Sequence, residues 1–251
     1  MATTPVIYFN EARFELLKLS RNRSYLFSMI GFPVVFYLLF GVTNRDSMFH
    51  GHTIARYLLA GYACFGAMGS SLFGIGAGLA FERGHGWLEM KRASPMPAAA
   101  YLLAKLCVSI TFGVGITALL MILGTAFAGV HITTVEGLRL LLVIAGGVLP
   151  FASLGLVVGL LMPSNAAPGV INLIYLPLSF CGGLWMPIET LPHWLQVAAH
   201  GLPSFWFSRL ALRTIGYVDG SALVAWALLA GYTVLFLLTA AFIFRRQEAQ
   251  A

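Results

Sequence analysis

The sequence holds few groups of residues that could carry out chemistry. It has no H-E-x-x-H, G-x-S-x-G or C-x-x-C motif, so the signatures of a zinc protease, a serine hydrolase and a dithiol centre are missing. The run Gly74-Ile75-Gly76-Ala77-Gly78 is superficially similar to a nucleotide-binding loop. However, no Lys-Ser/Thr pair follows it, and none of the three lysines (Lys18, Lys91 and Lys105) comes after a glycine. We therefore expect no P-loop in this chain, and interpret the glycines as sites of close helix–helix approach.

Histidines and cysteines are the remaining candidates for metal, redox or proton chemistry. His50 and His52 could pair on a metal, although solvated loop histidines are the commoner case. His193 and His200, seven residues apart, could share one helix face as a proton sensor. The three cysteines each lie inside an apolar run and fit small core hydrophobes better than a disulfide framework. We expect no metal site, no catalytic residue and no cofactor in this chain.

The composition defines the elements that position these residues. Of 251 residues, 59% are hydrophobic and 10% are charged, and the mean hydropathy is +0.85. An ordinary soluble domain has about 45–50% apolar and about 25% charged residues. These values exclude a soluble enzyme, a disordered chain and a disulfide-rich scaffold. They indicate an all-α integral membrane protein with a single domain over residues 1–251.

Six apolar runs are long enough to cross a membrane as helices. They are Ser24–Thr43, Ile54–Phe81, Leu102–Val130, Leu140–Met162, Gly169–Met186 and Ala222–Phe244. Prolines interrupt the fifth run. With six spans, Lys and Arg divide roughly two to one in favour of the side that carries both termini. The positive-inside rule then places both termini in the cytoplasm and the chain in the cytoplasmic (inner) membrane.

Three connecting segments are more than simple turns. Residues 1–23 form an amphipathic lead-in, with Phe9 and Leu16 on one face and Glu15 and Lys18 on the other. We expect an interfacial helix there; a short solvated helix is the alternative. Residues 82–100 form an inner loop. Residues 187–219 form an outer segment that we expect to fold into short re-entrant helices, with Trp185, Trp194 and Trp206 at headgroup level.

The predicted membrane interior is nearly empty of ionisable groups. Residues 57–81, 106–130, 140–162 and 222–244 contain no Asp, Glu, Lys, Arg or His. Ion-coupled transporters and pumps keep such a group at mid-membrane because it carries the coupling. The chain is therefore not expected to power transport itself. An apolar interior suits an apolar or amphipathic cargo and an energy source on another polypeptide.

Two stretches of the sequence resemble the ABC-2-type transporter permeases. One is the inner Glu82-Arg83-Gly84-His85-Gly86-Trp87-Leu88-Glu89, followed by Pro95 and Lys105. The other is the outer Gly182-Gly183-Leu184-Trp185-Met186-Pro187, followed by Leu191-Pro192, Trp194-Leu195 and Leu202-Pro203. The order of these motifs, the lead-in, the six runs and the terminal Arg245-Arg246 extend the resemblance over the whole chain.

The resemblance implies an ABC exporter in which two permeases, either two copies or a copy and a paralogue, sit above two separate ATPase subunits that bind ATP and Mg²⁺. It implies an ATPase-docking element formed by Glu82, Arg83, Gly86, Trp87, Leu88, Glu89, Lys91 and Arg92. A solvated loop whose Trp87 inserts into the membrane interface is the alternative. The outer segment is expected to act as a gate formed by Gly182, Gly183, Pro187, Pro192, Trp194, Leu195 and Pro203.

The cargo is expected to be drug-like, lipid-like or glycan-linked, and the bilayer is expected to be a partner while nucleic acid is not. Two other functions stay open at this point. One is a membrane-embedded lipid-modifying enzyme, which would need polar catalytic residues clustered at one interface. The other is a membrane scaffold or regulator that transports nothing. An adjacent reading frame for a Walker A ATPase would favour the transporter.

Overall fold

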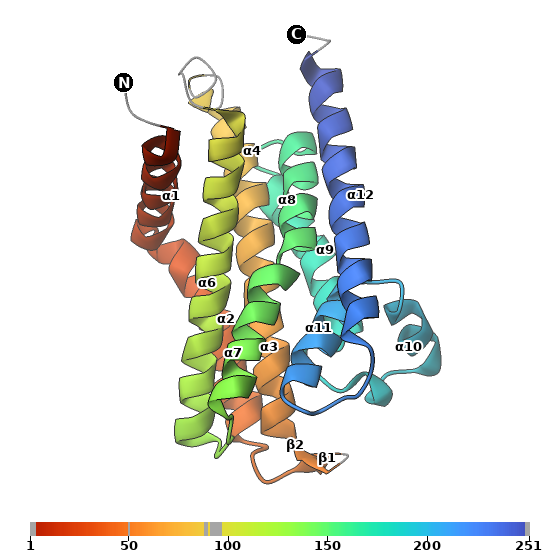
Figure 1. Ribbon diagram of the computed structural model, residues 1–251. Coiled ribbons are helices and arrows are strands. Elements are labelled where there is room, and N and C mark those ends of the chain that lie inside the picture. The colour runs from red at the N-terminus through yellow and green to blue at the C-terminus, as the bar shows by residue number, and fades with distance from the viewer. Residues whose placement is uncertain (1–3, 50, 88–89, 91–96, 249–251) are drawn as a thin grey trace.

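The computed structural model describes residues 4–49, 51–87, 90 and 97–248. Helices dominate these residues, with one short antiparallel hairpin (Figure 1). The first half contains α1 (Thr4–Arg21), α2 (Arg23–Phe36), the π-helical η1 (Tyr37–Val42), β1 (Met48–Phe49), β2 (His52–Thr53), α3 (Ile54–Ser71), the π-helical η2 (Leu72–Ala77) and α4 (Gly78–Gly84). The second half contains α6 (Ala98–Phe127), α7 (Thr134–Gly147), α8 (Leu149–Leu161), α9 (Ala167–Cys181), the 3-10 turn η3 (Ile188–Thr190), α10 (His193–Ala199), α11 (Pro203–Thr214) and α12 (Ala222–Glu248).

Five continuous helical stretches of the described chain are long and apolar enough to cross a membrane. They are Arg23–Val42, Ile54–Gly84, Ala100–Phe127, Thr134–Leu161 and Ala222–Gln247. They correspond to the first, second, third, fourth and sixth predicted spans. The fifth predicted span, Gly169–Met186, overlaps α9, a helix of only 15 residues. A sixth span therefore stays a prediction, and the finding is a helical membrane protein with five span-length helices in its described residues.

The two ends of the bundle differ in what they carry. In Figure 1, α1 begins and α12 ends at the same end, which we call the terminal end. The β1–β2 hairpin lies at the opposite end, which we call the hairpin end. This arrangement agrees with the prediction that both termini lie on one side of the membrane.

The continuous path α3–η2–α4 lies at the centre of the molecule. Of its most apolar stretch, 94% is buried; α6 lies against α3, α8 lies against η2, and α12 lies against α8. Glycines make this close packing possible. A Cβ atom on Gly76 would come 3.0 Å from the carbonyl oxygen of Gly155, and one on Gly159 would come 2.8 Å from that of Gly76. These contacts confirm close helix approach as the role of the Gly74–Gly78 stretch.

The lead-in forms a helix as predicted, but its faces are used differently from the expectation. Phe9 and Phe14 of α1 are exposed, whereas Glu15 is buried, and α1 lies alongside α6. Glu15 of the polar face thus points into the protein, whereas the Lys18 side chain on the same face is 39% exposed. The reason is that oppositely charged side chains on the neighbouring helices form ion pairs with Glu15 and Lys18.

Candidate functional site

The predicted docking element divides into a buried part and an exposed part. Glu82 and Arg83 lie in the last turn of α4, where the Glu82 side chain is only 2% exposed. The Arg83 guanidinium donates hydrogen bonds to the carbonyl oxygens of Leu160 and Met162, the latter at 3.0 Å. Both side chains therefore hold α4 inside this chain and present little surface to a partner.

The exposed part is an aromatic group beyond the end of α4. Gly86 adopts a left-handed φ of +71°, which turns the chain. Trp87 is 42% exposed, and its ring meets the edge of the half-exposed Phe81 ring at a centroid distance of 5.7 Å. The His85 ring lies 4.0 Å from the Phe81 ring. The predicted Leu88, Glu89, Lys91 and Arg92 lie outside the described residues, so the exposed aromatic surface is Phe81, His85 and Trp87.

Glu82 is one member of a buried group of charges, which we call the ion cluster. One carboxylate oxygen of Glu82 accepts hydrogen bonds from Lys105 Nζ at 3.2 Å and from Lys18 Nζ. The other oxygen accepts from the hydroxyl of Tyr101 at 2.5 Å. Glu15 completes the cluster, receiving Lys105 Nζ at 2.8 Å and Lys18 Nζ at 3.1 Å.

The charges of the ion cluster balance, which is why it can be buried. Two carboxylates face two ammonium groups, and the Lys105 side chain is only 1% exposed. Burial alone would lower the pKa of Lys18, but Glu15 and Glu82 outweigh it and raise that pKa above its ordinary value. Lys18 is therefore charged at neutral pH. The cluster joins α1, α4 and α6, and its member Lys18 lines the same cavity as Phe81 and Trp87 of the exposed aromatic surface.

A large cavity opens beside the ion cluster. Its volume is about 990 Å³, and its walls come from α1, α2, α3, η2, α4, α9 and the segment after α9. Nine aromatic residues contribute to the lining: Tyr25, Phe32, Phe36, Phe65, Phe73, Phe81, Trp87, Tyr175 and Trp185. Lys18 is the one formally charged residue among the lining residues that the structure describes, and it stands where the cavity meets the ion cluster.

The predicted gate residues fall into two groups. Gly182, Gly183, Pro187 and Pro203 are buried against the bundle. Gly183 has a left-handed φ of +72°, which requires glycine, and its carbonyl accepts a hydrogen bond from Tyr57 of α3.

The other three predicted gate residues lie in α10 or directly before it, and they are less buried than the first group. Pro192 is exposed, Trp194 at the start of α10 is 68% exposed, and Leu195 is half-buried. Trp185 packs against Phe65 at a ring-centroid distance of 5.5 Å, and its level in the membrane stays a prediction.

Sequence reasoning missed several residues that hold this architecture together. It used Lys105 as part of the inner motif and Lys18 as part of the polar face of the lead-in, and it assigned no ion-pair partner to either lysine or to Glu15. At the hairpin end, Arg56 of α3 donates to the carbonyl of Ile215 at 3.0 Å and pairs with Glu136 of α7 at 2.5 Å. A lone lysine within an apolar helix was the available signal, because such a charge needs a buried counter-charge.

The span-length apolar helices and the apolar cavity define a multi-pass membrane protein. The family model for the ABC-2 type transporter matches residues 11–216 of this chain. The chain belongs to the ABC-2 type transporter family. It is also 30% identical over 239 residues to the "Putative transport permease YvfS" of Bacillus subtilis (strain 168), an alignment that covers 94% of this chain and 96% of that protein.

Membership in this family confirms the resemblance drawn from the inner and outer motifs. It makes the chain a transport permease. Proteins of this family are transport subunits rather than enzymes, and membership implies association with the ATPase partners of an ABC transporter.

Proposed function

We propose that this chain is the transmembrane subunit of an ATP-driven exporter of the cytoplasmic membrane. The proposal places both termini, the ion cluster and the exposed aromatic surface in the cytoplasm, and the hairpin end outside. The observation that carries it is the aromatic cavity of about 990 Å³, which extends from Trp87 at the terminal end to Trp185 in the outer segment. A cavity that runs in this direction and has this lining is suited to serve as the pathway for the cargo.

The cargo under this proposal is apolar or amphipathic. Aromatic faces bind flat and apolar groups through burial of surface and through ring stacking. Lys18 adds one positive charge at the mouth of the cavity, although Glu15 and Glu82 neutralise much of it. The lining therefore favours a hydrophobic molecule with at most a small polar end, such as a drug-like, lipid-like or glycan-linked compound.

The energy under this proposal comes from two ATPase subunits below two permease chains, which are copies of this chain or a copy and a paralogue. The central stretches of the span-length helices lack ionisable groups that could couple transport to an ion gradient. The exposed ring of Trp87, next to Phe81, forms an apolar anchor of the kind that dominates protein–protein interfaces. We assign ATPase docking to this surface, with ATP and Mg²⁺ bound on the partner.

The substitution Trp87→Ala tests the docking role. Trp194→Ala is the matched control, because Trp194 is also an exposed tryptophan but belongs to α10 in the outer segment. Loss of an interface anchor costs about 2 kcal/mol or more, so we expect the affinity for the ATPase to fall by about 30-fold. Both variants should insert into the membrane normally. Equal stimulation of ATP hydrolysis by wild type and Trp87→Ala in reconstituted vesicles would remove Trp87 from the docking surface.

A further inference from the structure

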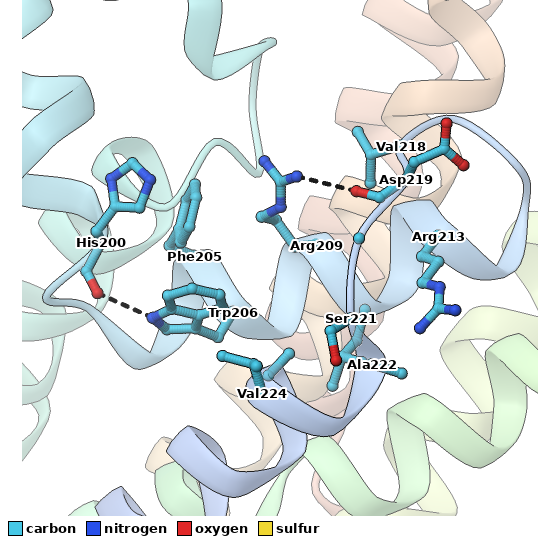
Figure 2. A pocket seen from close by; sticks show the side chains of 13 residues that line it. His200, Phe205, Trp206, Arg209, Arg213, Val218, Asp219, Ser221, Ala222 and Val224 are labelled. Carbon is cyan, nitrogen blue, oxygen red and sulfur yellow. Dashed lines mark hydrogen bonds between the residues drawn. The ribbon is translucent and has the colours of Figure 1, made fainter.

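A second pocket lies far along the chain from the ion cluster, between α11 and the start of α12. Its volume is about 300 Å³, and Arg209, Arg213 and Trp206 line it together with the loop that leads into α12. Figure 2 shows the two arginines on the same stretch of α11, with the loop passing over them. Neither the ATPase-docking surface nor the aromatic cavity includes this pocket.

The pocket lining carries more positive than negative charge, since Arg209 and Arg213 stand against the single carboxylate of Asp219. Arg209 and Arg213 are four residues apart and therefore lie on one face of α11. The carboxylate of Asp219 forms no ion pair with either arginine, and Figure 2 shows it pointing away from both. Arg213 is exposed and makes no hydrogen bond or ion pair with any residue in the described part of the chain. Its donors are free for a ligand.

The surroundings hold Arg209 in place. Its guanidinium donates a hydrogen bond to the carbonyl oxygen of Asp219 at 3.2 Å and lies 5.6 Å from the centre of the Phe205 ring. Trp206 is fixed in turn, because its indole N–H donates to the carbonyl of His200 at 2.8 Å. The pocket thus has an aromatic wall, one guanidinium fixed against the loop, and a second guanidinium that has no partner in the described chain.

The apolar surface next to the pocket identifies the kind of ligand. Ala222, Val224 and Ala225 of α12 line the pocket floor. Leu223, Val224 and Leu228 expose large apolar areas along the same helix, and only 11% of the most apolar stretch of α12 is buried. A ligand with a phosphate group and hydrocarbon chains would satisfy both parts, since guanidinium groups bind phosphate in a forked geometry.

We propose that the pocket between α11 and α12 binds the phosphate of a phospholipid headgroup, with the acyl chains lying along α12. This inference goes beyond the proposed transport function, because it concerns a lipid that stays bound to the protein and needs no ATPase. Free phosphate shares the headgroup chemistry but has nothing to place on Leu223 and Val224. The observed combination of charge and apolar surface therefore favours the lipid.

Native mass spectrometry of the purified full chain in detergent tests this site. The probe is dioleoyl-phosphatidylglycerol, and dioleoylglycerol is the matched ligand that has the same chains without phosphate. Arg213→Gln removes the free guanidinium without breaking a contact inside the described protein. Arg139→Gln is the matched control, since Arg139 of α7 is also exposed but does not line the pocket.

We expect wild type and Arg139→Gln to retain phosphatidylglycerol equally, and Arg213→Gln to bind it about tenfold more weakly. Dioleoylglycerol should bind wild type at least tenfold more weakly than phosphatidylglycerol. Equal loss in Arg139→Gln, an unchanged Arg213→Gln, or equal binding of the two lipids would overturn the site. Complete displacement of the lipid by an equimolar amount of inorganic phosphate would identify free phosphate as the ligand and overturn the lipid assignment.

Discussion

Lys105→Met is the substitution that most sharply tests the ion cluster. The Lys105 side chain is 1% exposed, and its ammonium group lies 2.8 Å from Glu15 and 3.2 Å from Glu82. Methionine has a similar length and no charge, so it leaves two buried carboxylates facing the single ammonium group of Lys18. Lys18 cannot fully replace the lost partner, because its side chain is 39% exposed and partly screened by solvent.

The expected cost follows from this burial. Removing one partner of a buried ion pair destabilises a protein by about 3–5 kcal/mol, because it leaves an uncompensated charge away from water. Arg45→Met is the matched control, since Arg45 pairs with Asp46 at 3.5 Å on the exposed surface. An exposed pair of this kind contributes about 0–1 kcal/mol. The two substitutions remove the same charge and should therefore differ by several kcal/mol.

The free energy of unfolding can be measured by titrating purified protein in dodecylmaltoside micelles with sodium dodecyl sulfate while following tryptophan fluorescence. The double variant Glu15→Gln/Lys105→Met restores the charge balance and should lose less stability than the two single variants added together. Additive losses, or a loss below about 1 kcal/mol for Lys105→Met, would show that the cluster is not a coupled buried unit.

Three further predictions concern the cavity, the outer segment and the core. Phe32→Ala removes a ring from the cavity lining and should weaken binding of an amphipathic fluorescent dye. Phe27→Ala, on the same helix but outside the lining, should leave that binding unchanged. Equal effects of the two substitutions would count against the cavity as the cargo site. Leu195→Cys should react with a membrane-impermeant thiol reagent added outside intact cells, and labelling only after lysis would contradict the outer placement of α10. Gly159→Val should destabilise the fold by several kcal/mol or prevent the protein from accumulating in the membrane, because a Cβ there meets the backbone of Gly76 at 2.8 Å. A yield and a free energy of unfolding equal to those of the wild type would refute close α8–η2 packing.

Apolar run length was enough to predict most of the helical architecture. Five of the predicted runs form span-length helices, because a long apolar segment satisfies its backbone polar groups in a membrane only as a helix. The fifth run did not reach that length. Pro168 lies in the first turn of α9 and Pro177 inside it, and the left-handed Gly183 follows the helix end. Pro168 limits extension at the start of α9 and Gly183 limits it beyond the end, whereas the helix continues through Pro177 to Cys181.

The ion cluster could not be read from the sequence. Glu15 and Lys105 are separated by 90 positions, and a periodic pattern on one helix carries no information about the partner on another. Glu15 also lies on the polar face of α1, which ordinarily predicts exposure to solvent. Tertiary pairing reversed that expectation. The contact of Trp185 with Phe65 could not be predicted for a similar reason, since it depends on how the segment after α9 folds back onto α3.

The most direct measurement of the central claim is uptake of an amphipathic dye by inside-out membrane vesicles that contain this chain and its co-purifying ATPase. The account predicts that ATP drives accumulation, that a protonophore leaves it unchanged, and that a catalytically inactive ATPase abolishes it. Accumulation that persists with the inactive ATPase, or that collapses with the protonophore while ATP remains, would contradict the claim that this permease depends on a separate ATPase for its energy.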